Sequence, residues 1–262
     1  MWLDTKRAVK VPRVTAAFWV VKLLTTALGE SVSDYAVHRF DPVVAVAVGF
    51  VGFVVALAVQ LRLPRYVAAV YWVTVAMVAV FGTMAADVVH VRFHVAYGVS
   101  TAAFAVVLAV VFVTWYRTER TLSIHTIDST RRELFYWCTV AATFALGTAV
   151  GDLTATSVGL GYFGAGVLFA CLIALPGLAW RFGGLNAVAC FWVAYVLTRP
   201  LGASIADWLG KPRSLHGLAY GDGPVGASFL ALFVVAVAWL AFTGFDARPD
   251  RSTPVGSDRS AR

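Results

Sequence analysis

The sequence predicts an all-α, polytopic membrane protein with eight transmembrane helices, arranged as four parallel two-helix repeats. Three observations support this prediction. The chain of 262 residues is 60% hydrophobic and only 13% charged, with a mean hydropathy of +0.79, whereas a soluble domain averages about 45–50% apolar and about 25% charged residues. Eight apolar stretches are long enough to cross a bilayer, which takes about 20 helical residues. One motif also recurs four times.

The eight apolar stretches follow one another with short connections. These connections leave no room for a soluble domain, so we expect residues 1–245 to form a single transmembrane domain. We expect no cleavable signal peptide, because the first apolar stretch follows a basic segment and carries Lys22 and Glu30. The predicted spans are roughly 14–35, 42–62, 66–89, 94–116, 132–155, 158–181, 186–208 and 224–245.

The repeated motif is an aromatic residue followed by Trp, a Gly ten residues after the Trp, a small residue four positions later, and then an Asp. The spacing from Trp to Asp is fifteen residues in every copy. Self-similarity of this kind indicates a repeat architecture. The copies are Phe18-Trp19…Gly29…Ser33-Asp34, Tyr71-Trp72…Gly82…Ala86-Asp87, Tyr136-Trp137…Gly147…Gly151-Asp152 and Phe191-Trp192…Gly202…Ala206-Asp207.

Each repeat pairs a span that carries the motif with a span that is almost purely apolar. Because each repeat holds two spans, all four enter the membrane in the same direction, and an axis along the membrane normal should relate them. We therefore expect the four motif-bearing spans to line a shared centre. The Gly and the small residue favour close packing of helices. The repeats are expected at about 14–62, 66–116, 132–181 and 186–245.

The distribution of basic residues predicts that both termini are cytoplasmic. Lys and Arg concentrate on one side of the membrane, as the positive-inside rule describes, so the net charge of +7 reports orientation and not nucleic-acid binding. The stretch 246–262 is expected to be a disordered cytoplasmic tail. The predicted inner side holds Lys6, Arg7, Lys10, Arg13, Arg62, Arg65, Arg117, Arg120, Arg131, Arg132 and Arg181, and the outer side holds Arg39, Arg92, Lys211 and Arg213.

Ionisable side chains gather on one face of the motif-bearing spans. At about 100° per residue, this face carries the Trp, the positions three, seven and eleven residues after it, and the Asp. Such groups are costly at membrane depth and by default mark a functional site. The outer repeats hold most of them, so we expect one asymmetric site built mainly by the first and seventh spans. The candidate ion-binding residues are Lys22, Thr26, Glu30, Asp34, Asp87, Asp152, Arg199 and Asp207.

Lys22 and Arg199 are the two basic residues well inside the apolar spans. Each should have an acidic partner, and Glu30 is the nearest candidate for both. If all groups are ionised, five acids face two bases and the interior is net negative, which favours a cation or a protonation change. Alternatively, the Asp side chains receive hydrogen bonds from neighbouring repeats and stabilise the bundle. Pro200 predicts a break or a kink in the seventh span.

Two histidines near the mouth of the acidic centre suggest a metal-capture site. His90 and His94 follow closely after Asp87, and imidazole together with carboxylate suits Zn, Mn, Fe or Ni. With Asp34 and Asp207 they form the candidate metal-ligand set. The spacing matches no strict motif, and solvated loop histidines are the alternative. No resident cofactor is expected.

Four stretches of the chain permit a comparison with a known family. They are Lys10-Val-Pro with Phe18-Trp19…Lys22…Thr25-Thr26…Gly29-Glu30, Thr121-Leu-Ser-Ile-His125, Leu146-Gly-Thr-Ala…Gly151-Asp152, and Leu197-Thr-Arg-Pro-Leu-Gly-Ala203 with Lys211-Pro. In these residues the chain resembles a bacterial family of multi-pass membrane proteins with four copies of a two-helix repeat, each with a characteristic Trp. The resemblance implies the eight-helix architecture and the bacterial cytoplasmic membrane. That family is described as repeats of unknown function, so the resemblance implies no substrate.

The sequence favours an integral membrane transporter of a small cation, with a divalent metal ion, coupled to protons, as the first candidate cargo. The alternative is a non-transporting membrane scaffold or sensor with structural Asp residues, in which the loop 117–131 docks a partner. An enzyme is not expected, because zincin, P-loop, Rossmann and Gly-x-Ser-x-Gly motifs are absent. The expected partners are the cation and the lipid bilayer, with no nucleic acid, and a homo-oligomer is left open.

Overall fold

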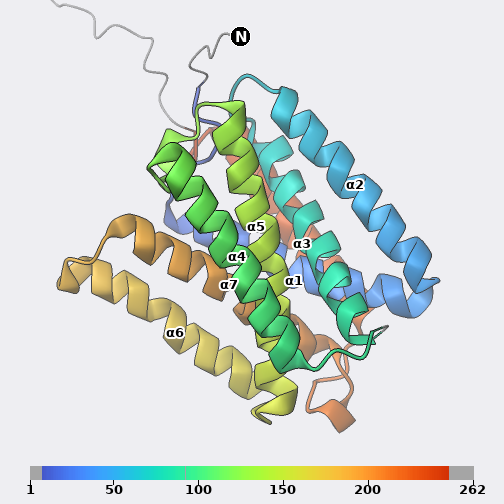
Figure 1. The fold of residues 1–262 in the computed structure, drawn as a ribbon. Coiled ribbons are helices and arrows are strands. Elements are labelled where there is room, and N and C mark those ends of the chain that lie inside the picture. The colour runs from blue at the N-terminus through green and yellow to red at the C-terminus, as the bar shows by residue number, and fades with distance from the viewer. Residues whose placement is uncertain (1–7, 92, 248–262) are drawn as a thin grey trace, which may run out of the picture.

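The computed structural model describes residues 8–91 and 93–247. Within these ranges the chain is all-helical, with eight long helices and no strands, and Figure 1 shows them as one bundle. The predicted tail beyond residue 247 and the basic residues Lys6, Arg7 and Arg92 lie outside the described part. The helices are α1 (Ala16–Arg39), α2 (Pro42–Arg62), α3 (Ala68–Val91), α4 (Tyr97–Glu119), α5 (Thr130–Asp152), α6 (Gly161–Gly183), α7 (Ala187–Gly210) and α8 (Asp222–Thr243), with short turns η1 (Ile124–Thr126), η2 (Leu153–Ser157) and η3 (Arg213–Leu215).

Local sequence signals set several helix ends. A side-chain oxygen before the helix accepts a hydrogen bond from a free backbone N–H of the first turn, and α2 has in addition Pro42 at its first position. At their C-terminal ends, α6 and α8 stop at Gly184 and Gly244, which adopt left-handed φ values of 65° and 62°. The side-chain caps are Thr15 for α1, Asp41 for α2, Ser129 for α5 and Asn186 for α7.

Seven of the eight helices in the described ranges are long and apolar enough to cross a membrane. The remaining helix, α1, has 24 residues, but it carries Lys22, Glu30 and Asp34, whose side chains are buried inside the protein. The apolar side chains of the outer helices are largely exposed, as expected of surfaces that face lipid. These features are those of a multi-pass membrane protein.

The four odd-numbered helices form a closed ring. α1 packs on α3 and α7, and α5 packs on the same two helices. The even-numbered helices lie outside, each against the odd helix that follows it: α2 on α3, α4 on α5, α6 on α7, and α8 back on α1. Accordingly, 67%, 67% and 61% of the spans in α3, α5 and α7 are buried, against 11–28% in the even helices. The packing matches the expectation that the motif-bearing helices line a shared centre.

The motif Gly is the contact point between neighbouring helices of the ring. If this Gly carried a Cβ, that atom would lie less than 3.0 Å from a residue on the next helix of the ring. That residue always stands seven positions after the motif Trp of its own helix. The same contact thus occurs four times and closes the ring, as small residues do at interfaces of membrane helices. The contacts are Gly29 with Ala79, Gly82 with Phe144, Gly147 with Arg199, and Gly202 with Thr26.

The motif Trp side chains face protein more than lipid. Trp72, Trp137 and Trp192 are buried, and Trp19 is partly buried. They belong to an aromatic layer in which the hydroxyl groups of Tyr71 and Tyr136, the residues preceding two of these Trp, hydrogen-bond each other. This layer fills the ring at the end where the described chain begins.

Asp246 lies at the same end of the bundle. The sequence places it at the start of the tail, but the structure buries its side chain completely. Its carboxylate accepts hydrogen bonds from Tyr66 and, at 3.3 Å, from Trp72 Nε1, and its carbonyl accepts one from the backbone N–H of Arg13 at 2.9 Å. Burial and the hydrogen bond to Asp246 raise the pKa of Tyr66 well above its ordinary value, so its hydroxyl keeps the proton that it donates.

Helix α7 continues through Pro200 without a break, so the interruption predicted at this position does not occur. The proline ring lies against two glycines of α5. A Cβ on Gly147 would be 3.1 Å from the Pro200 ring, and one on Gly151 would be 3.7 Å from Pro200. Because these two glycines have no side chains, α5 leaves the space that Pro200 occupies between the helices.

We predict that Gly147→Ala lowers the free energy of unfolding by about 1–3 kcal/mol, the usual cost of overpacking, because the new Cβ would collide with the Arg199 side chain. Gly177→Ala in α6 is the control, since a Cβ there meets no atom within 4 Å and Ala favours a helix over Gly. Thermal unfolding in detergent measures both. Equal midpoints for the two variants would contradict the role assigned to Gly147.

Candidate functional site

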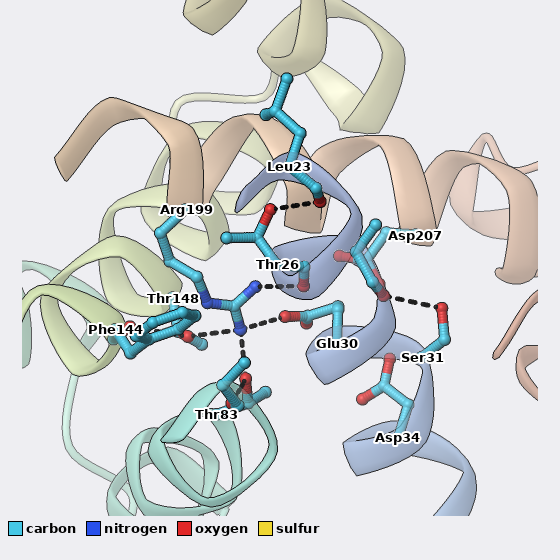
Figure 2. Close-up of polar contacts among 12 residues, drawn as sticks. Leu23, Thr26, Glu30, Ser31, Asp34, Thr83, Phe144, Thr148, Arg199 and Asp207 are labelled. Atoms are coloured by element: carbon cyan, nitrogen blue, oxygen red, sulfur yellow. Dashed lines mark hydrogen bonds and ion pairs between the residues drawn. The ribbon is translucent and has the colours of Figure 1, made fainter. Parts of the chain in front are cut away.

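The guanidinium of Arg199 lies at the centre of the ring, fully buried, and contacts all three other ring helices (Figure 2). Its Nη1 donates to the carbonyl of Thr26 on α1 at 3.1 Å. Its Nη2 donates to Glu30 Oε2 at 2.5 Å and to Thr148 Oγ1 on α5 at 2.9 Å. Nη2 also donates to the hydroxyl of Thr83 on α3. One side chain therefore connects α7 to α1, α3 and α5.

Glu30, Thr83 and Thr148 occupy the same position in their repeats, eleven residues after the motif Trp. The fourth repeat has Ala203 there, and Arg199 extends from the preceding turn of α7. The expectation that Arg199 is paired with Glu30 is confirmed. Removing one partner of such a buried pair is strongly destabilising, because a buried charge is left uncompensated.

Lys22 does not have the acidic partner that the sequence predicts. Its side chain is 1% exposed, and among the described residues its Nζ has no hydrogen-bond partner. Instead, Nζ lies 3.9 Å from the ring centroid of Phe144 and 4.2 Å from that of Tyr195. The Arg199 guanidinium lies 5.6 Å from the centroid of the same Phe144 ring. Two basic side chains thus lie against one aromatic ring, and Glu30 is paired with only one of them.

Three carboxylates converge on the other side of Arg199. Glu30, Asp34 and Asp207 are all buried, and one oxygen of each lies within 4.8 Å of the others. Lys211 Nζ is 2.5 Å from Asp34 Oδ2 and 3.9 Å from Asp207 Oδ1. Burial alone would lower the pKa of Lys211, but Asp34 and Asp207 outweigh it and raise that pKa above its ordinary value. The group can therefore hold a cation, and two side-chain cations already contact it.

Lys211 was not among the site residues that the sequence predicts. Two signals pointed to more: its spacing of four residues from Asp207, and the Lys-Pro pair. It follows the end of α7 directly, and this position lets it reach a carboxylate on α1.

Asp87 and Asp152 lie farther from this cluster. Their carboxylates are partly buried and form no ion pair or hydrogen bond within residues 8–91 and 93–247. Electrostatic interactions link Asp87 to Glu30 and Asp152, and link Asp152 to Glu30 and Asp34. The four motif Asp residues thus belong to one electrostatic group, but only Asp34 and Asp207 join the close cluster with Glu30.

The two histidines are elsewhere. A ring nitrogen of His90 lies 3.0 Å from the carbonyl of Val95, and its other ring nitrogen lies 3.2 Å from Ser100 Oγ. His94 is exposed and has a positive φ of 54°. Among the described residues, the group of metal-ligating side chains contains Glu30 and neither histidine. The structure therefore does not assemble the expected set of Asp34, Asp87, Asp207, His90 and His94.

A second buried ion pair lies at the end of the bundle that holds the aromatic layer. Lys10 Nζ donates to Glu133 Oε2 at 2.6 Å and to the carbonyl of Leu61 at 3.1 Å. The other carboxylate oxygen of Glu133 accepts from Gln60 at 3.0 Å. These bonds attach the segment before α1 to α2 and α5, and the sequence analysis did not identify them.

Together, the ring of helices and its polar centre define a helical-repeat protein of multi-pass membrane type. The chain belongs to the family described as Repeat of Unknown Function (DUF347), whose model matches residues 17–66, 70–121, 135–183 and 190–245. The four matches confirm the resemblance, and each contains one ring helix and one outer helix. A search of curated proteins finds no match, and a search of solved structures finds none.

We predict that Glu30→Gln lowers the free energy of unfolding by about 3–5 kcal/mol, because it leaves the Arg199 charge buried without a carboxylate. The control is Asp128→Asn, which removes a partly exposed ion pair with Arg132 and should cost less than about 1 kcal/mol. Thermal or denaturant unfolding of the purified protein compares the two. A Glu30→Gln variant as stable as the control would contradict the pairing.

Proposed function

We propose that this protein is an integral membrane transporter of a small cation, located in the bacterial cytoplasmic membrane with both termini inside. The excess of basic residues on one side of the predicted spans supports this orientation. The hydrogen bond between Arg13 and Asp246 brings both described ends of the chain to one end of the bundle. The repeats are then parallel, and a transport path along the ring axis runs between the two sides of the membrane.

The observation that carries the proposal is the close cluster of Glu30, Asp34 and Asp207. Buried carboxylates within 4.8 Å of one another repel each other unless a cation lies among them or one of them is protonated. Arg199 and Lys211 supply that charge for Glu30 and Asp34. The buried Asp207 Oδ1 accepts no hydrogen bond from the described residues. A mobile cation can bind here and displace a side-chain cation, so that no buried charge is left alone.

The cargo that the sequence suggests is a divalent metal ion, with transport coupled to protons. A metal would bind the same three carboxylates, since oxygen ligands suit hard cations. Arg199 and Lys211 would leave as it enters and return when it departs, so each acts as a tethered counter-charge. Asp87 and Asp152 would attract the cation towards the cluster, and Lys22 would oppose its passage in the bound state.

A scaffold or sensor is the second candidate. The observation in its favour is that Arg199 bonds to three other helices, so the same side chain also stabilises the ring. In that function the carboxylates only balance fixed charges, and no ion is needed.

Thermal stability of the wild-type protein separates the two functions. A transporter binds its cargo in the folded state, so we predict that one cation in a panel of Mg²⁺, Mn²⁺, Zn²⁺, Na⁺, K⁺ and ammonium-type salts raises its melting temperature at constant ionic strength. No stabilisation by any of them, together with strong destabilisation by Asp34→Asn alone, would favour the scaffold.

Flux into liposomes tests transport directly. We predict that Asp207→Asn reduces cation uptake at least about tenfold, the effect of losing about 1.4 kcal/mol of ligand binding. The fold should persist because, among the described residues, Asp207 Oδ1 accepts no hydrogen bond and lies 3.9 Å from Lys211 Nζ. Asp41→Asn is the control, since Asp41 is exposed and Asn caps a helix equally well. Wild-type uptake of every cation equal to that of protein-free liposomes would overturn the proposal.

A further inference from the structure

The oxygens around the Arg199 guanidinium can only accept hydrogen bonds. Thr83 Oγ1 donates its proton to the carbonyl of Ala79 at 2.9 Å, and Thr148 Oγ1 donates to the carbonyl of Phe144 at 3.1 Å. Both hydroxyl protons are therefore committed to the helices that carry them, and lone pairs face the guanidinium. The other two acceptors are a carboxylate and a carbonyl. This oxygen cage, made of Thr26 O, Glu30, Thr83 and Thr148, accepts N–H donors or a cation and repels anions.

The oxygen cage carries one negative charge. Glu30 is its one ionisable member, and the guanidinium that it holds has one positive charge. A ligand that replaces the guanidinium must also carry one positive charge to leave the buried site neutral. A divalent ion would leave the site neutral only if Lys211 also left Asp34, whereas a monovalent cation has to displace Arg199 alone.

The aromatic surroundings of Lys22, which shares Phe144 with Arg199, favour organic cations. Lys22 Nζ lies against the faces of Phe144 and Tyr195. Among the described residues it donates no hydrogen bond. Aromatic faces of this kind bind ammonium and guanidinium groups, whereas divalent metals prefer oxygen ligands. The protein thus holds the amino group of Lys22 and the guanidinium of Arg199 at two successive levels of the ring of helices.

We propose that the cation accepted at the ring centre is a monovalent nitrogen cation of the guanidinium or alkylammonium type, which replaces Arg199 in the oxygen cage. The proposal rests on the proposed transport function and replaces the divalent metal as its cargo. When a ligand enters, Arg199 leaves the cage and needs another carboxylate. Asp87 and Asp152 have no ion pair in the described part of the chain and already interact electrostatically with Arg199, so they receive it.

Chemical rescue tests the proposal. Arg199→Ala empties the oxygen cage and keeps its acceptors, and its melting temperature should fall below that of the wild type. Guanidinium chloride at low millimolar concentration should then raise the midpoint by about 3–6 °C when present at about ten times its Kd. Methylammonium chloride should give a smaller rise. NaCl, KCl and MgCl₂ at matched ionic strength should give none.

Two controls identify the site. The rescue by guanidinium should disappear in Arg199→Ala/Glu30→Gln, which lacks the carboxylate of the cage. Arg131→Ala removes an arginine that also pairs with a carboxylate, that of Glu119, but whose side chain is 66% exposed, so guanidinium should not stabilise it. If Arg199→Ala does not fold, uptake of labelled guanidinium into wild-type liposomes replaces the assay. That uptake should saturate, and methylammonium should compete with it while Mg²⁺ should not.

The outcomes separate this proposal from the transport function. Stabilisation of Arg199→Ala by Mg²⁺ or Na⁺ in place of guanidinium overturns the cargo class, as does a folded variant that no cation stabilises. In the assay of guanidinium uptake by wild-type liposomes, uptake that does not saturate, or that Mg²⁺ inhibits, also overturns the cargo class. Rescue by guanidinium without any wild-type flux retains the cation site and overturns transport. Metal flux without rescue retains transport and overturns the nitrogen cation.

Discussion

The whole ring depends on the burial of one guanidinium. Arg199 has no exposed surface, and such a charge is tolerated only if carboxylate and hydrogen-bond partners surround it. Its partners come from α1, α3 and α5, so the rotation and depth of all four ring helices must be correct together. One side chain can reach three helices only because the helices lie close. The four glycine contacts provide that closeness, and the geometry of the motif is therefore a condition for the charge at its centre.

The repeats share a framework and differ in their chemistry. The Trp, the Gly and the small residue occur in all four copies, and the Gly makes an equivalent contact in each. Seven and eleven residues after the Trp the copies diverge: Thr26 and Arg199 stand at one level, and Glu30, Thr83 and Thr148 at the next. A fully symmetric ring would place identical charges opposite one another, and like charges at such distances repel. Divergence at these two levels allows an acid and a base to meet on the axis.

Much of the fold and part of the site follow from the sequence. Apolar length gave the helices, and the motif spacing gave the ring. The pairing of Arg199 with Glu30 followed because a buried base needs an acid. The same reasoning failed for Lys22, since aromatic faces took the place of a carboxylate. Periodicity shows which face a residue occupies but not which neighbouring helix meets that face. For this reason the reach of Lys211 to Asp34, the contacts of His90 and the fit of Pro200 against glycines appear only in three dimensions.

The structural role of Arg199 and the transport role proposed for it involve the same interaction. The guanidinium fills the oxygen cage when no ligand is bound and leaves it when a ligand binds. A ligand can shift the position of Arg199 only by as much as it binds the opened state more tightly than the closed one. In the closed state the guanidinium has one carboxylate and three neutral oxygens as partners of its two Nη atoms, and among the described residues its Nε has no hydrogen-bond partner. The opened state must provide comparable partners, or no ligand could open it. Asp87 and Asp152 are the carboxylates within electrostatic reach, and in the described part of the chain neither has another ion-pair partner. These two acids on α3 and α5 can therefore receive a guanidinium that moves, as the proposed exchange requires.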